Sequence, residues 1–412
     1  MARDRRCKPG SHRRSAQVGS WHDAQDSATG QSVTIEAVMN MLADILSGSS
    51  DLFVPAFEVW IGQQKLDRHI IRDVLDVSFH DSIDELGGFS LTLANWDADQ
   101  YTFSYSDKHI FDPGQRLDIR MGYLGRGQMS WMIRGIITDL IPSFPAGGPP
   151  TLSVSGRNRL QDLLGQRRSK VYPPGMDTDL ARQIELAFPD LSISVDEGDL
   201  ATVLQLQDVV QDNEFDLVFL KRRASQLGFE LIVTETDSGT EIHLINSLQC
   251  RGEPLKLVYR SSLRGGPLLE FQPRFSTARQ PEALELNSWN PREKTAISVR
   301  VGRNDLRIRD PKFDSDNIAT AVRKRLEVIS SEPVQDEAEG RRRATDYMER
   351  IVKNTMTATG RTIGLPELRS GCVLQIEGVG ERFRGRWFVT SSDHTIGAGG
   401  YTTSFACRRE EL

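Results

Sequence analysis

The sequence contains few of the residues from which compact catalytic and metal centres are built. Its 412 residues include only four cysteines and seven histidines, which form no Cys-x-x-Cys pair, no zinc-ligand spacing and no His-Glu-x-x-His motif. No Gly-x-Ser-x-Gly nucleophile elbow is present. The glycines at 122–125 and 378–380 are not followed by a predicted helix, which a dinucleotide-binding loop would require. We therefore expect no catalytic residue, no metal site and no cofactor, and we do not expect an enzyme.

Long apolar runs are also absent. None approaches the ~18 residues that a membrane-spanning helix needs, so we expect no direct membrane span. The first residues are basic, but no apolar segment of a secretory signal follows them. The irregular spacing of Cys7, Cys250, Cys372 and Cys407 fits assembly in the reducing cytoplasm rather than a disulfide framework. Cys372 and Cys407 fall in predicted strands, where we expect small buried side chains.

Charge is distributed unevenly along the chain. Residues 1–16 carry six Lys and Arg residues against one Asp, so residues 17–412 carry −11 of a total net charge of −6. An acidic body argues against nucleic acid as a partner, because phosphate binding depends on clustered basic residues.

Residues 1–50 lack sustained periodicity, and we expect them to form a mostly disordered basic leader. Met39 or Met41 is an alternative start residue.

Hydrophobic periodicity divides the remaining chain into three parts. Residues 51–157 have apolar residues at every second position in about six segments, which predicts a six-stranded antiparallel β-barrel. Residues 158–255 mix helical and strand patterns and predict a small α+β domain. Residues 256–412 return to the strand pattern and predict a second, similar barrel, with a helical excursion at about 303–368. The expected fold class is mainly β with an α+β insertion.

Local signals place the elements of the last two parts. In the α+β part, helices are predicted from Asp177 and from about Asn213, with Gly228 ending the second. A hairpin is predicted at 229–245. In the last part, strands at 283–289 and 296–301 are assigned to the second barrel.

The two β-rich parts repeat one order of turn residues. The order is Gly114, Arg134-Gly135, Gly147-Gly148 and Arg157 in the first part, and Gly371, Arg384-Gly385, Gly399-Gly400 and Arg409 in the last. The final interval, from Gly148 to Arg157 and from Gly400 to Arg409, is nine residues in both. Each glycine alone predicts a turn with positive φ, and antiparallel barrels in general place glycines in hairpins. The shared order nevertheless favours a duplication.

A duplication would have a consequence for assembly. Three chains in a closed ring would present six similar barrels, which would match a sixfold tube to a threefold spike. Closed barrels also leave few unpaired strand edges. Two unrelated topologies, or one continuous sheet across both parts, would leave this symmetry argument without its structural basis.

Several segments resemble the phage late control gene D family of tail hub proteins and the hub part of valine-glycine repeat protein G of type VI secretion. The resemblance covers about residues 54–409. Its segments are 84–93, 111–114, 121–123, 135–138, 211–216, 219–220, 223–224, 368–371, 385–390, 394 and 400–403. Within them the structural family motif comprises Phe89, Leu91, Pro113, Gly114, Gly122, Gly135, Thr138, Phe219, Leu220, Ala224, Gly371, Gly385, Thr390, Gly400 and Tyr401.

The resemblance implies a structural baseplate hub of a phage-tail-like contractile injection machine. The implied assembly is a homotrimer, bound above by the inner tube protein and below by a spike protein, beside other baseplate subunits. Hub proteins fused to a spike continue into further domains, whereas this chain ends at Leu412, so the spike is expected to be a separate protein. The chain would assemble in the cytoplasm and then form part of a phage tail or similar particle.

A cell-envelope module that binds or hydrolyses peptidoglycan is the alternative function. Two carboxylates suffice for glycoside hydrolysis, and pairs such as Asp84 and Glu85 are present. With 57 acidic residues in the chain, such pairs also arise by chance in solvated loops. His394 is expected in the turn before Gly399, bonded to backbone.

Overall fold

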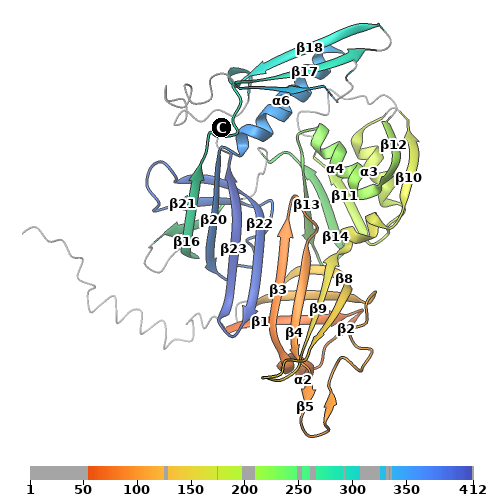
Figure 1. Cartoon of the computed structure of the whole chain (residues 1–412), viewed down its shortest axis with the longest axis vertical. Coiled ribbons are helices and arrows are strands. Elements are labelled where there is room, and N and C mark those ends of the chain that lie inside the picture. The colour runs from red at the N-terminus through yellow and green to blue at the C-terminus, as the bar shows by residue number, and fades with distance from the viewer. Residues whose placement is uncertain are drawn as a thin grey trace, which may run out of the picture. The chain divides into compact units, whose positions relative to one another are not determined.

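The computed structural model describes residues 54–124, 129–173, 175–196, 209–247, 253–259, 266–290, 293–306, 325–330, 334 and 336–410 (Figure 1). These residues belong to one compact unit, 53–412. The predicted leader, both alternative start residues, Cys7 and Cys250 lie outside the described residues. The predicted domain boundaries after residues 157 and 255 stay predictions.

Six strands form the first β-rich region, which we name the first sheet region. They are β1 (Val54–Ile61), β3 (Val74–Ser82), β4 (Gly88–Ala94), β7 (Arg116–Leu124), β8 (Ser130–Ser143) and β9 (Thr151–Asn158). Their order is β1-β7-β8-β9-β4-β3, with every neighbouring pair antiparallel. Smaller elements accompany them: β2 (Gln64–Lys65), α2 (Arg68–Asp73), β5 (Trp96–Asp97) and β6 (Thr102–Phe103).

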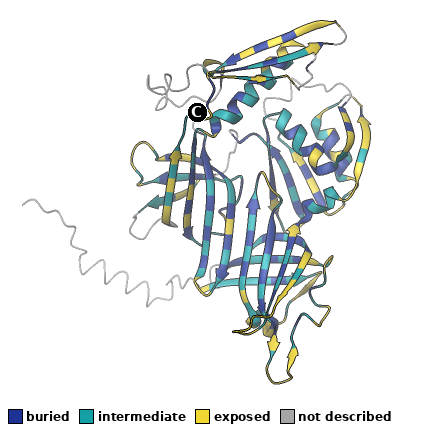
Figure 2. Cartoon of the chain, viewed as in Figure 1, coloured by how far each residue is buried: buried dark blue, intermediate teal, exposed yellow. Residues whose placement is uncertain are grey.

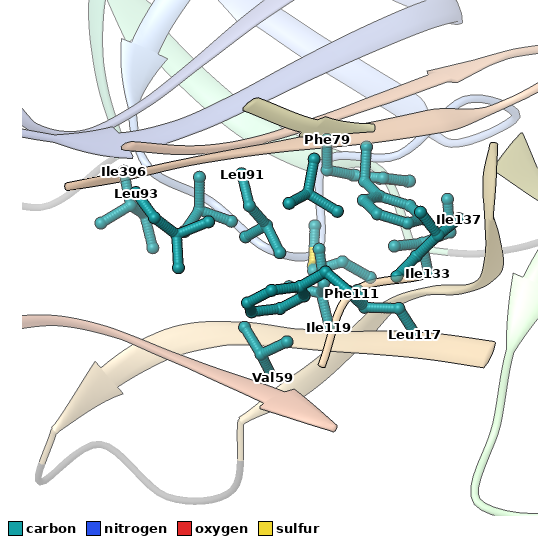
Figure 3. Close-up of a cluster of buried hydrophobic side chains, with 14 of the residues drawn as sticks. Val59, Phe79, Leu91, Leu93, Phe111, Leu117, Ile119, Ile133, Ile137 and Ile396 are labelled. Atoms are coloured by element: carbon teal, nitrogen blue, oxygen red, sulfur yellow. The ribbon is translucent and has the colours of Figure 1, made fainter. Parts of the chain in front are cut away.

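The alternating apolar residues of these strands enclose one hydrophobic core (Figure 3). Leu91 and Leu93 of β4 are fully buried, whereas Ser90 and Thr92, which alternate with them, face the other side. No pairing closes the region between β1 and β3, two strands that the structure describes in full. Ile396, from the last β-rich region, instead packs against the same core.

A second set of six strands forms a closed barrel. The strands are β15 (Leu255–Tyr259), β16 (Gly266–Phe275), β20 (Met356–Ile363), β21 (Val373–Glu377), β22 (Gly385–Gly397) and β23 (Gly400–Arg409). They follow the order β15-β16-β20-β23-β22-β21, and β21 pairs with β15 to close the ring. Buried and more exposed residues alternate along these strands (Figure 2). The barrel interior contains Trp387 and Phe405.

Strands β3 and β22 pair with each other, so both regions belong to one thirteen-stranded sheet. The expected arrangement of two similar closed barrels is therefore not confirmed: the described residues form one closed six-stranded barrel, and the first sheet region continues into it. Sequence periodicity shows that a segment is a strand, but it carries no information about which distant strand supplies the partner.

The two regions nevertheless share a strand order. In the first sheet region β4 pairs with β3 and β9, and β8 lies between β7 and β9. In the barrel β20 pairs with β16 and β23, and β22 lies between β21 and β23. These strands hold the same positions in chain order within their regions. The five later strands also pair antiparallel in both regions. The first strands differ, because β1 is antiparallel to β7 whereas β15 is parallel to β21. That the two regions superpose stays a prediction.

The excursion in the last part has its own sheet and helix, and it begins near residue 283 rather than at about residue 303 as predicted. It contains β17 (Ala283–Asn290), β18 (Thr295–Gly302), η4 (Arg303–Asp305), β19 (Leu326–Ile329) and α6 (Glu337–Lys353). The strands predicted at 283–289 and 296–301 are therefore strands, but their assignment to the second barrel is wrong, because they pair only with each other and β19 among the described residues. Their apolar side chains pack against α6 instead. The predicted helix is confirmed, and the Asp336 side chain caps it.

In the middle part, the described residues form two smaller sheets and two α-helices around a separate core. Its elements are η1 (Arg159–Leu164), β10 (Arg167–Tyr172), α3 (Asp177–Glu185), β11 (Leu191–Val195), β12 (Val209–Phe215), α4 (Asp216–Gln226), β13 (Glu230–Glu235) and β14 (Thr240–Ile245). The helix expected from Asn213 begins later, because Asn213 to Phe215 extend β12. Gly228, with a φ of 70°, follows α4 as predicted. The β13–β14 hairpin is also confirmed.

Candidate functional site

The described residues contain no group of three or more His, Cys, Asp and Glu that could hold a metal ion. None of the described helices has the length and apolar character needed to cross a membrane. The feature that stands out is the junction between the first sheet region and the barrel. We define this junction by the β3–β22 pairing and the residues packed around it.

The junction begins with backbone pairing over Val77–Ser82 and Ser391–Ile396. The Ile83 amide extends it by donating to the Thr390 carbonyl oxygen, at 3.0 Å. His80 lies opposite Asp393, with Nδ1 2.7 Å from Oδ1. The hydrogen bond with Asp393 raises the His80 pKa, against the opposing effect of burial. The junction is therefore bound by main chain and by a cross-strand pair.

His394 lies at the centre of the junction. It was expected in a turn, but it belongs to β22 and is fully buried, because the strand continues to Gly397. Its Nε2–H donates to the Leu368 carbonyl oxygen at 3.0 Å, so the expected backbone bond is present. Nδ1 lies 3.0 Å from the Tyr401 hydroxyl and 3.1 Å from Thr403 Oγ1, which can donate to it. Burial, assisted by the charge of Arg369, lowers the His394 pKa to about 3, so the ring is neutral.

A buried ion pair connects the segment before β21 to the first sheet region. Arg369 Nε donates to Asp81 Oδ2 at 2.9 Å, and the Asp81 side chain is only 4% exposed. The Ser370 amide also donates to this carboxylate, at 3.3 Å. The Arg369 guanidinium lies over the Phe79 ring, 4.7 Å from its centroid, and donates to the Trp131 carbonyl oxygen. One arginine thus holds β3, β8 and the barrel together.

The tip of the β13–β14 hairpin contacts the same face of β8. The guanidinium groups of Arg120 and Arg134 both lie over the Trp131 indole, 3.6 and 4.4 Å from the ring centroid. Its Nε1–H donates to Asp237 Oδ1 at 2.8 Å. Arg134 also donates to the Thr236 carbonyl oxygen at 2.6 Å. Buried beside this contact, Glu235 has a pKa raised to about 7 by desolvation.

A second charged cluster lies where β13, β23 and α6 meet. Arg408 pairs with Glu230 and with Glu410. Lys353 of α6 lies 3.6 Å from Glu410 and donates to Ser247 Oγ at 2.6 Å. All four charged side chains are at most 18% exposed. Paired buried charges of this kind fix the relative placement of the elements that carry them.

The family-motif residues of the first sheet region lie mainly in its core or its turns. Phe89 and Leu91 are core residues of β4. Gly135 leaves room for Phe89, since an added Cβ would lie 2.8 Å from Phe89 Cε1. The others are exposed Pro113 and Gly114 in a turn, buried Gly122 on β7 and exposed Thr138 on β8.

The remaining motif residues are spread over the middle part and the barrel. Phe219, Leu220 and Ala224 of α4 are buried in the middle core. Gly371, Gly385, Thr390, Gly400 and Tyr401 lie in or beside β21, β22 and β23. Of these, Gly371 packs against Ile232, whereas Thr390 and Tyr401 contact the junction. The structure thus brings together only part of the motif.

Asp81 was not singled out from the sequence, and Arg369 was included only as part of the resemblance segment 368–371. Asp81 and Arg369 are 288 positions apart, and neither shows a local signal of its partner. Cys407 is buried in β23 as expected, whereas Cys372 immediately precedes β21 instead of lying in a strand.

Comparison with known proteins identifies a family model that matches this chain and solved structures that share its fold. A family model described as the Alg8 N-terminal domain matches residues 54–398. A prophage MuSo2 43 kDa tail protein from Shewanella oneidensis matches with a TM-score of 0.62 and 17% identity, over 86% of this chain and 98% of its own. A tail protein from Neisseria meningitidis MC58 matches with a TM-score of 0.63 and 12% identity, over 87% and 97%.

A type VI secretion component of E. coli, described as similar to T4 bacteriophage tail proteins gp27 and gp5, also matches. Its TM-score is 0.52 at 13% identity, over 85% of this chain and 76% of its own. No curated protein matches the sequence. The chain therefore has the fold of phage tail proteins, in agreement with the resemblance found in the sequence.

Proposed function

This chain belongs to the Alg8 N-terminal domain family, and from its fold we propose that it is the baseplate hub of a phage-tail-like contractile injection machine. In this role it forms a homotrimer that adapts a sixfold inner tube to a threefold spike. The tube protein binds above, a separate spike protein binds below, and other baseplate subunits surround the ring. The role is structural and involves no catalysis by this chain.

The observation that carries this proposal is the fold shared with phage tail proteins, together with the sequence resemblance to tail hub proteins. The shared strand order of the two six-stranded regions adds support for the symmetry match. Three chains that each contribute two such regions present six similar strand sets around one axis. The continuous sheet removes the two independent closed barrels on which the sequence argument depended. What supports the symmetry match is therefore the repeated order and direction of five strands in each region.

The rigid junction fits this role. A part that transmits force between a tube and a spike must keep its two strand sets in a fixed relation. The β3–β22 pairing, the Arg369–Asp81 ion pair and the buried His394 supply that relation within one chain. Assembly would take place in the cytoplasm, before incorporation into the particle.

The test is the oligomeric state with the partners present. Co-expressed with its candidate tube and spike proteins, the chain should co-purify with both, and native mass spectrometry should give a trimer with the spike. Cryo-electron microscopy of that complex should show six related strand sets facing the tube. A stable monomer or dimer in the presence of the spike would contradict the proposal. Peptidoglycan hydrolysis by the purified chain would favour the cell-envelope alternative instead.

A further inference from the structure

A cavity of about 720 Å³ lies between the barrel, the middle part and the end of α6. We name it the α4–barrel cavity. Its volume falls in the range of ~300–1,000 Å³ typical of ligand sites. It borders the junction at Ile83 and Thr390 and the charged cluster at Glu230 and Arg408, but no role assigned so far uses the space itself.

One wall is the outer face of three neighbouring barrel strands. Arg274, Thr357 and Arg408 lie side by side in register across β16, β20 and β23. A second row, Gln272, Thr359 and Ala406, lies next to the first. Because these residues alternate with the ones that fill the barrel, their side chains point outward into the cavity.

The opposite wall comes from α4 and β13. Lys221 and Ser225 lie one turn apart on α4 and so share a face. Arg350, near the end of α6, donates to the Ser225 carbonyl oxygen at 3.1 Å and thereby borders the same space. Apolar contact area is supplied by Phe229 and Leu231, among others.

The charges that line this cavity do not balance. Lys221, Arg274, Arg350 and Arg408 are cationic, whereas only Asp84 and Glu230 are anionic. Glu230 is already engaged by Arg408. Among the described residues no carboxylate lies within ion-pair distance of the other three cations. Burial lowers the pKa of Lys221, an effect that Asp84 and Glu85 offset only in part.

We propose that the α4–barrel cavity binds an acidic segment of a partner protein, with Lys221, Arg274 and Arg350 contacting its carboxylates. Such a segment supplies the missing negative charge, and charge-assisted hydrogen bonds to carboxylates are among the stronger contacts available. The side-chain amides of Gln272 and Asn354 and the hydroxyl of Thr359 suit the polar groups of a peptide backbone.

A peptide fits this lining better than nucleic acid does. Single-stranded nucleic acid binds where exposed aromatic rings stack on its bases, and the one aromatic ring in the lining, Phe229, is 4% exposed. The chain outside residues 1–16 also carries a net charge of −11, which repels an extended polyanion but leaves a short acidic segment free to enter a local cationic cavity.

The test uses the full-length chain and a fluorescent hexaglutamate peptide, with hexaglutamine as the uncharged comparison. Anisotropy should detect binding of hexaglutamate alone, weakened by added salt. Lys221→Gln and Arg350→Gln should each weaken binding about tenfold or more, the loss of one charge-assisted contact. The matched control is Arg300→Gln, an exposed arginine on β18 outside the cavity lining, and it should bind as the wild type does.

Thermal unfolding of the variants distinguishes a loss of peptide binding from a loss of the fold. Lys221→Met removes a charge that burial disfavours and also the hydrogen bond from Lys221 Nζ to the Asp84 carbonyl oxygen, at 2.7 Å. These effects oppose each other, so its unfolding temperature should change little, and yet it should lose peptide binding. The proposal is overturned if hexaglutamate binds no better than hexaglutamine, or if Arg300→Gln weakens binding as much as the cavity variants do. Pyrophosphate binding that depends on Lys221 and Arg350, without peptide binding, would assign the cavity to phosphate and also overturn it. Binding is measured on the isolated chain, so this result is independent of the hub proposal.

Discussion

Phe89 on β4 lies directly opposite Gly156 on β9, and its ring covers the place where a side chain at Gly156 would stand. The barrel repeats this relationship between its corresponding strands with the roles exchanged, since Phe405 on β23 lies opposite Gly360 on β20. A glycine weakens a strand because it has no side chain to pack, and an aromatic ring laid over it restores that packing. Gly156 and Gly360 were not among the residues singled out from the sequence.

Gly156→Ala should destabilise the chain by about 1–3 kcal/mol, the usual cost of overpacking a core. The added Cβ would lie 2.5 Å from Phe89 Cζ and would also meet the Ile136 carbonyl oxygen. Gly360→Ala should behave alike, since its Cβ would lie 2.8 Å from Phe405 Cε1. Urea unfolding measures both. The control is Gly147→Ala, where the added Cβ meets nothing within 4 Å, and equal midpoints for all three variants would contradict the packing argument.

Gly400→Val should cost on the order of 1–2 kcal/mol or more, because Gly400, the first residue of β23 after the turn from β22, has a φ of 90°, and a β-branched residue is strained there. Gly148, with a φ of 144° in the matching turn of the first sheet region, should respond similarly to Val. Gly400→Val should destabilise the barrel more than the first sheet region, and Gly148→Val should do the reverse. Hydrogen exchange locates the damage, and wild-type stability and assembly for both variants would remove the turn role assigned to these glycines.

Asp81→Ala should destabilise the chain by about 3 kcal/mol, because it leaves the Arg369 guanidinium without its partner in a largely buried site. Arg369→Met alone should also destabilise. The double variant should lose less than the sum of the two, and a double-mutant cycle measures this coupling. The exposed pair Arg384–Glu381 serves as the control, and its removal should cost about 0–1 kcal/mol. Additive losses at Asp81 and Arg369 would show that the pair does not couple the two regions.

His394 should make the fold sensitive to acid. Its pKa is lowered to about 3 in the folded chain, against about 6.5 when unfolded, so the unfolded chain binds more protons between these values. The stability is therefore complete above pH 6.5 and declines as the pH falls toward 3. His394→Gln should flatten this part of the pH profile of unfolding free energy. If unfolding free energy falls equally steeply with pH in His394→Gln and in the wild type, other groups cause the acid sensitivity.

Glu235 should act in the opposite direction. Its pKa is raised to about 7 by burial, against about 4.3 when unfolded, so the folded chain binds the extra proton. Stability from this group rises as the pH falls from about 7 toward the unfolded value. Glu235→Gln should therefore stabilise the chain at pH 8 relative to the wild type, and this advantage should vanish below pH 4. If the variant and the wild type differ in unfolding free energy by the same amount at pH 8 and below pH 4, Glu235 does not carry a buried charge at pH 8.

Strand and helix positions followed from local chemistry. Apolar alternation located the core strands such as β4, the helix of the predicted excursion at about 303–368 is α6, and Gly228 marked the end of α4. These features depend on neighbouring residues, whose side-chain periodicity and backbone preferences are written in the sequence itself. His394 was misplaced because the strand that contains it runs past the predicted turn.

The sequence by itself determined that this chain is mainly β, that its turn glycines repeat in order, and that it resembles tail hub proteins. Only the tertiary structure decided that β17 and β18 leave the barrel, that β3 pairs with β22, and that Asp81 meets Arg369. The physical reason is that a strand's own pattern fixes which face is buried but not which edge is paired. Strand partners far apart in the sequence are selected by the packing of the whole chain.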